Sequence, residues 1–120
     1  MIMKLNYITF MVRDIDKTID FYQNLAGLKI VRRFNPGMGE IAFMTNAEGE
    51  IKLEFIQFEK VPKVQASGMT MSYKVEGSLD EVRNKAIAMG YHPSEIIIEP
   101  PKPKHFKVLD ADDIEVEFSL

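Results

Sequence analysis

The chain has 120 residues, a formal net charge of −3 and no cysteine, which excludes disulfides, thiolate metal sites and a cysteine nucleophile. Its length suits one domain with one sizeable core, and no apolar run approaches the ~20 residues that a membrane-spanning helix needs. Because acidic and basic residues are interspersed and the opening residues lack a secretory signal, we expect a cytoplasmic protein with a small-molecule or protein partner, no nucleic acid and no membrane.

The first half of the chain predicts a strand, a helix and three more strands. Residues 5–12 place apolar side chains at every second position, which is typical of a strand. Asp14 or Asp16 can cap a following helix of about three turns, which ends at Gly27. Turns rich in Gly, Pro and Asn then separate three further predicted strands, at residues 28–34, 40–46 and 50–58.

The second half repeats this order after a polar stretch at residues 59–68. A strand is predicted at 69–75, and a helix follows at 78–90, where Ser78 and Glu81 have the spacing of a capping box. Three strands complete the half, at residues 94–100, 105–110 and 113–120.

The two halves share one register. Glu54 and Glu117, each near the middle of the last strand of its half, lie 63 positions apart, and so do Gly27 and Gly90. Element order and register therefore indicate a duplication more clearly than residue identity does. We predict two βαβββ modules in a single domain, module 1 at about residues 1–60 and module 2 at about residues 68–120.

Two stretches resemble the vicinal oxygen chelate superfamily, which contains glyoxalases, bleomycin-resistance proteins and extradiol dioxygenases. Residues 7–31 have the family's opening strand, a V-x-D turn, a helix with Phe-Tyr and a Leu-x-Gly-Leu ending, and residues 109–118 have its aspartate-rich turn before Ile-Glu-Val. The resemblance implies an α+β fold whose tandem modules form a curved mixed sheet with the helices on the convex side. It also implies a ligand cavity on the concave face and a homodimer.

Metal-dependent members of that family carry four ligands, typically His, Glu, His or Gln, and Glu on the first, fourth, fifth and eighth strands. By the motifs, these positions fall on Tyr7, Glu54, Thr70 and Glu117. Both nitrogen donors are missing, although imidazole is what holds Zn, Ni or Fe in such sites, and a tyrosine must lose its proton from a pKa near ~10 to coordinate well. The donor set favours no bound metal, and a divalent cation on Glu54 and Glu117 is the alternative.

The alternation of side chains assigns further residues to the predicted ligand-binding face. A solvated sheet face gives the same pattern, so the cavity interpretation depends on the resemblance. Glu115 also has this parity, but it lacks the 63-residue offset and is expected at the rim or in solvent. The predicted ligand-binding residues are Tyr7, Thr9, Met11, Lys52, Glu54, Thr70, Ser72 and Lys74.

The histidines and the proline-rich segment at residues 96–106 each have two interpretations. His92 is expected in an exposed turn, whereas His105 is either structural or an acid, base or replacement ligand, a role that its unperturbed pKa near ~6.5 suits. The segment is either a stiff, soluble loop or a lid whose Lys102, Lys104 and His105 attract an anionic ligand.

Three functional hypotheses follow from these residues and the resemblance. The first is a resistance-like or sensor-like protein that binds a small organic ligand without an essential tightly bound transition metal. The second is a metal-dependent glyoxalase-like lyase or isomerase, or a dioxygenase-like enzyme, that uses Glu54 and Glu117, with Glu117 and His105 as candidate catalytic residues. The third is a non-catalytic interaction domain.

Overall fold

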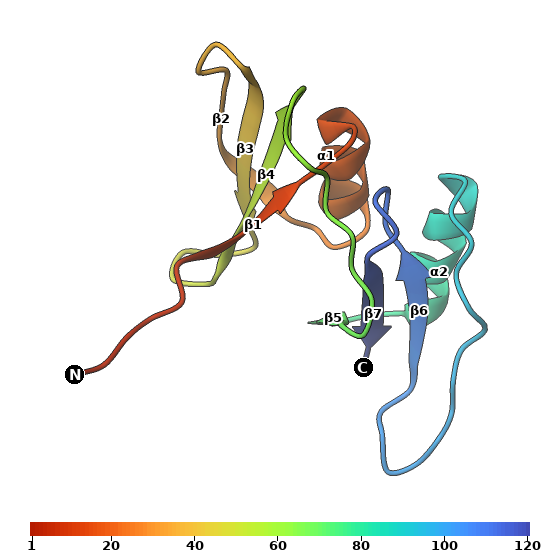
Figure 1. Ribbon diagram of the computed structural model, residues 1–120. Helices are drawn as coiled ribbons and strands as arrows, with labels where there is room; N and C mark the ends of the chain where they lie inside the picture. Colours follow the sequence, from red (N-terminus) through yellow and green to blue (C-terminus); the bar gives the residue numbers. More distant parts are fainter. The chain divides into compact units, whose positions relative to one another are not determined.

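The computed structural model describes all 120 residues, and the chain divides into two compact units, Met1–Val64 and Gln65–Leu120. The structure is α+β, as the sequence predicts, and contains two helices and two mixed sheets (Figure 1). The first unit contains β1 Tyr7–Met11, α1 Ile15–Asn24, β2 Lys29–Phe34, β3 Gly39–Thr45 and β4 Lys52–Phe58. The second contains β5 Met71–Lys74, α2 Leu79–Ala88, β6 His105–Leu109 and β7 Glu115–Ser119.

In the first unit, α1 covers one face of a sheet with strand order β1-β4-β3-β2, in which only β1 and β4 are parallel. The helix begins at its N-cap Asp14, whose side chain accepts a hydrogen bond from the Lys17 backbone N–H. Tyr22 of α1 stacks on Phe55 of β4, which in turn stacks on Phe10 of β1, and all three are buried. Neighbouring residues of a strand face opposite sides of the sheet. Because α1 is the only helix of this unit, the face opposite these rings carries no helix of the unit.

In the second unit, α2 packs beside a sheet with strand order β5-β7-β6. Ser78 is the helix N-cap and accepts from the Glu81 backbone N–H, which is half of the predicted capping box. Phe118 of β7 stacks between Tyr73 and Phe106 on the apolar face of the sheet. The polar residues of β5, β6 and β7 therefore lie on the opposite face.

The predicted strand at residues 94–100 is wrong, because only an isolated bridge between Ile97 and His105 forms there. Ser94 interrupts the ladder: its hydroxyl accepts the Lys107 backbone N–H that a strand carbonyl would otherwise accept. Pro103 then ends the pairing, since it would be the next partner, opposite Glu99, and proline has no N–H to donate. The second module has one regular strand fewer than expected, and the strands predicted at 105–110 and 113–120 are β6 and β7.

The aspartate-rich turn at residues 110–114 sets the register of β6 against β7. Asp110 Oδ1 accepts backbone N–H groups from Asp112 and Ile114 at 2.8 and 3.0 Å, and Asp113 has a left-handed φ of 62°, a conformation that aspartate tolerates better than most residues. This turn pairs Lys107 with Glu117 and so fixes which glutamates face the polar side. Neither helix is long and apolar enough to cross a membrane.

Candidate functional site

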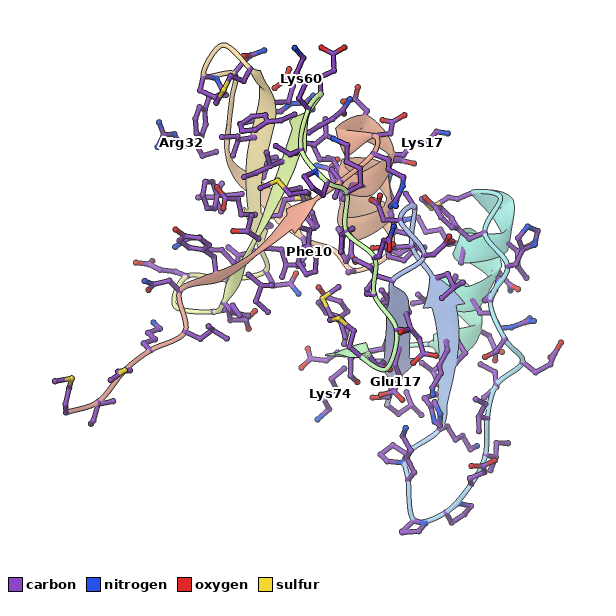
Figure 2. All side chains as sticks on the ribbon, viewed as in Figure 1. Phe10, Lys17, Arg32, Lys60, Lys74 and Glu117 are labelled. Carbon is purple, nitrogen blue, oxygen red and sulfur yellow. The ribbon has the colours of Figure 1, made fainter.

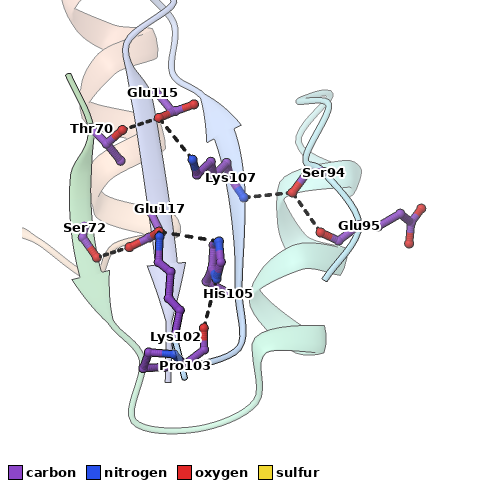
Figure 3. Close-up of polar contacts among 10 residues, drawn as sticks. All are labelled: Thr70, Ser72, Ser94, Glu95, Lys102, Pro103, His105, Lys107, Glu115 and Glu117. Atoms are coloured by element: carbon purple, nitrogen blue, oxygen red, sulfur yellow. Dashed lines mark hydrogen bonds and ion pairs between the residues drawn. The ribbon is translucent and has the colours of Figure 1, made fainter. Parts of the chain in front are cut away.

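Glu117 of β7 is the centre of the polar face of the second unit, which we define as Thr70, Ser72, Lys74, His105, Lys107, Glu115 and Glu117. Its side chain is only 9% exposed, yet both carboxylate oxygens have partners (Figure 3). The Ser72 hydroxyl donates to Oε2 at 2.6 Å, and the Lys102 Nζ lies 2.7 Å from Oε1. Ser72 reaches it because β5 pairs with β7 in register, whereas Lys102 comes from the loop before β6.

These contacts keep Glu117 ionised. The hydrogen bond from Lys102, followed by that from Ser72, lowers the pKa of the Glu117 carboxyl below its ordinary value, and the opposing effect of burial is smaller. The positive charge of Lys102 acts in the same direction, and so does that of His105 when its ring is protonated. At neutral pH the polar face therefore contains a carboxylate whose charge Lys102 balances.

Replacing Lys102 by methionine is expected to raise the pKa of Glu117, because the strongest contact favouring its ionised form is lost. In the parent protein the folded-state pKa lies below the unfolded-state value. The stabilisation is thus fully present above the unfolded-state pKa and is lost as pH falls through the folded-state pKa. Lys102→Met should therefore lose less stability on acidification.

Carbon-13 NMR titration of the glutamate carboxyls, with unfolding curves at neutral and acidic pH, measures both effects. Lys104→Met in the same exposed loop is the matched control, since the Lys104 side chain does not contact Glu117. An unchanged Glu117 titration in Lys102→Met would contradict the assigned contact.

His105, the first residue of β6, is buried at 3% exposure and lies beside Glu117. Its Nδ1 is 3.0 Å from the Pro103 carbonyl oxygen. A carbonyl only accepts, so Nδ1 carries the proton and Nε2 faces Glu117 Oε1 at 3.7 Å. His92, by contrast, lies in an exposed position after α2.

Glu115 has partners that sequence reasoning missed. The Thr70 hydroxyl, just before β5, donates to Glu115 Oε2, and the Lys107 Nζ lies 3.8 Å from the same oxygen. Thr70 thus pairs with Glu115 and not with Glu117. The spacing in the sequence could have indicated this contact, because Thr70 and Glu115 have the same 45-residue separation as Ser72 and Glu117.

The first unit repeats the hydroxyl and glutamate pair. The Thr9 hydroxyl of β1 donates to Glu54 Oε1 of β4, with the same separation of 45 residues. The strand register also places Tyr7 opposite Lys52 and Met11 opposite Ile56 on this open face. We define the open face of the first unit as Tyr7, Thr9, Met11, Arg32, Phe43, Lys52, Glu54 and Ile56.

A hollow of about 290 Å³ lies at one end of this open face. Tyr7 and Phe43 meet there edge to face, with ring centroids 5.5 Å apart. Of the residues around this hollow, Tyr7 and Lys52 are predicted from the sequence, whereas those from β2 and β3 are not. The hollow is lined by Asn6, Tyr7, Val31, Arg32, Phe43 and Lys52.

The candidate residues thus form two sets, one in each unit. Within either set, no group of three or more His, Cys, Asp or Glu side chains is placed to hold a metal ion. Glu117 is already bound by an ammonium group, and Glu54 accepts from a hydroxyl. The donor chemistry is that of hydrogen-bonded carboxylates, and it does not fit a nitrogen-rich transition-metal site.

Two units with mixed sheets, each with a helix against one face, match the glyoxalase type of α+β fold. The family model of the Glyoxalase/Bleomycin resistance protein/Dioxygenase superfamily matches residues 4–118, and the chain belongs to this superfamily. A comparison with curated protein sequences finds no match.

Solved structures share the fold at low sequence identity. TnmS3, an antibiotic binding protein from Streptomyces sp. CB03234, is 13% identical with a TM-score of 0.75, and the match covers 98% of this chain and 95% of that chain. FosX, a fosfomycin resistance protein from Listeria monocytogenes, is 17% identical with a TM-score of 0.78, covering 99% and 93%. The trypanothione-dependent glyoxalase I of Leishmania major is 18% identical with a TM-score of 0.77, covering 98% and 86%.

Proposed function

We propose that this protein binds a small organic ligand against a polar sheet face, in the manner of a glyoxalase/bleomycin-resistance-like protein, without an essential tightly bound transition metal. The observation that carries the proposal is the state of Glu117, whose carboxylate is neutralised by Lys102 and hydrogen-bonded by Ser72. Tyr7 and Thr70 stand where the family's metal-dependent members place nitrogen ligands. The fold similarity to TnmS3, described as an antibiotic binding protein, supports a ligand-binding role.

Metal content and ligand-dependent thermal shifts test this proposal together. Protein purified without a tag or chelator is expected to contain far less than one equivalent of Zn, Ni, Mn or Fe. Compounds that bind the native state should raise the melting temperature by mass action. Stoichiometric metal that disappears in the Glu54→Gln, Glu117→Gln double variant, but not in Glu48→Gln on an exposed turn, would overturn the metal-free proposal.

A second candidate function is a glyoxalase-like lyase or isomerase, and the burial of His105 beside Glu117 favours it. When His105 is neutral with its proton on Nδ1, Nε2 can accept a proton, and Glu117 next to it can stabilise the imidazolium that forms. Proton exchange at the carbon next to a substrate carbonyl, followed by NMR in deuterated water, is the direct measurement. Loss of this exchange in His105→Gln, with retention in His92→Gln, would establish the enzyme.

We also propose that the protein is cytoplasmic, as its opening residues favour, and that it forms a homodimer, as the family resemblance implies. Sedimentation equilibrium over a range of protein concentrations measures the oligomeric state. A species with the mass of one 13.8 kDa chain at all concentrations would exclude the dimer.

A further inference from the structure

The hollow on the open face of the first unit is lined by two cations that form no ion pair. Arg32 of β2 and Lys52 of β4 both line it, and no carboxylate does. Neither cation forms an ion pair, in contrast to Arg33, which contacts Asp16 and Glu40. The nearby carboxylate on this face is Glu54, which already accepts the Thr9 hydroxyl. The hollow is therefore suited to an anionic group.

Arg32 is held in position by an aromatic ring. Its guanidinium carbon lies 4.2 Å from the centroid of the Phe34 ring, which belongs to the same strand and faces the same side. A cation–π contact of this kind orients the planar group and leaves its N–H donors free at the edge. Such a pre-oriented guanidinium matches the two oxygens of a carboxylate with two parallel hydrogen bonds. Arg32 (Figure 2) is the anchor that a carboxylate needs.

Two aromatic rings, beside Asn6 and Val31, form the rest of the lining of the hollow. Tyr7 is 48% exposed and Phe43 is partly exposed, so both rings keep accessible surface although they contact each other edge to face. A third ring can add to such a pair by offset or edge-to-face stacking. The volume of about 290 Å³ lies at the lower end of small-molecule sites, which limits the occupant to one or two rings.

We infer that this hollow binds a small aromatic acid, with the ring against Tyr7 and Phe43 and the anionic group between Arg32 and Lys52. This inference rests on the proposed ligand-binding function and names the ligand class. The strand register brings the four residues together from all four strands of the sheet.

The test uses 2-naphthoate as the probe and 2-naphthamide, which has the same ring system without the charge, as its neutral counterpart. In nitrogen-15 NMR titrations of the full chain, 2-naphthoate should shift amide signals of β1, β2, β3 and β4. The Arg32→Gln, Lys52→Met double variant should weaken its binding by about tenfold or more, as expected for losing charge-assisted hydrogen bonds. Tyr7→Leu should weaken both probes.

Lys17→Met is the matched control for charge, because Lys17 is exposed on the far side of α1 from the sheet (Figure 2). All replaced side chains are exposed, so circular dichroism and melting temperatures should show that the variants fold. Equal binding of both probes, or an equal loss in Lys17→Met, would overturn the inference.

The same titrations separate this inference from the proposed function. If neutral or cationic compounds bind elsewhere and 2-naphthoate leaves the hollow unshifted, the aromatic-acid inference fails while the ligand-binding function stands. If compounds of no class bind anywhere on the chain, both fail.

Discussion

Replacing Phe55 by alanine is expected to destabilise the protein by about 3–5 kcal/mol, the range measured when a buried aromatic ring is removed from a core. Phe55 is 1% exposed and stacks on Phe10 and Tyr22, with ring centroids 5.6 and 5.0 Å apart. The truncation leaves a cavity between β1, β4 and α1 that these rigid rings cannot fill by small movements. Urea unfolding followed by far-ultraviolet circular dichroism measures the loss.

Phe58→Ala is the matched control, because it removes the same side chain from the same strand at a partly exposed position. It should cost clearly less than Phe55→Ala. Similar losses for the two variants would mean that the stacked rings do not form the core of the first unit. Phe55→Ala should also weaken ligand binding on the opposite face, since Glu54 and Lys52 depend on the position of β4.

The sequence predicted most strands correctly because burial of one face fixes which residues alternate. In β7, Val116 and Phe118 are buried against the helix side, and Glu115 and Glu117 face the other side, as expected. The 63-residue offset between Glu54 and Glu117 corresponds to two equivalent contacts, Thr9 with Glu54 and Ser72 with Glu117. Periodicity thus identified the residues of the two faces, although not their partners.

The prediction of a strand at residues 94–100 was wrong because the composition of this segment favours a strand, whereas its local hydrogen bonds prevent regular strand pairing. Three consecutive isoleucines have high β propensity, and Ile97 does form one bridge to His105. The Ser94 hydroxyl nevertheless replaces a backbone acceptor at one end, and Pro103, which would pair with Glu99, lacks a donor at the other. The pattern of apolar residues does not show that one serine hydroxyl competes with a backbone carbonyl for a strand hydrogen bond.

The residues that contact Glu117 or line the hollow were harder to predict from the sequence than Glu117 itself. Lys102 reaches Glu117 from an irregular loop, whose path no periodic pattern describes. Arg32 lies in β2, where nearly every residue is exposed and a register shift between Ile30 and Arg32 interrupts the alternation. Without a buried face, the sequence does not show on which side of the sheet Arg32 lies.

Replacing Gly39 by alanine is expected to destabilise the protein by about 3 kcal/mol or more, a loss typical of strain at a special backbone conformation combined with a steric clash. Gly39 begins β3 opposite Phe58 with a φ of +139°, and an added Cβ would lie 2.1 Å from the Gln57 carbonyl oxygen. This atom belongs to the backbone of β4, so the strands themselves would have to separate. Gln57 would move with them, and its side chain accepts the Ile15 backbone N–H at the start of α1.

Two control substitutions separate the backbone strain from the steric clash in the stability loss of Gly39→Ala. Gly37→Ala, in the same turn, has a φ of +111° and no neighbour within 4 Å of the new Cβ, so it retains the backbone strain without the clash. Gly77→Ala has neither a positive φ nor a neighbour and should be neutral or slightly stabilising, because it restricts the unfolded chain. In urea unfolding, the loss of stability should therefore be largest for Gly39→Ala, smaller for Gly37→Ala and smallest for Gly77→Ala. Faster amide exchange at the β3–β4 pairing should occur in Gly39→Ala alone. Equal losses in the first two would show that β3 and β4 absorb the clash, and that the glycine at 39 is required only for its backbone conformation.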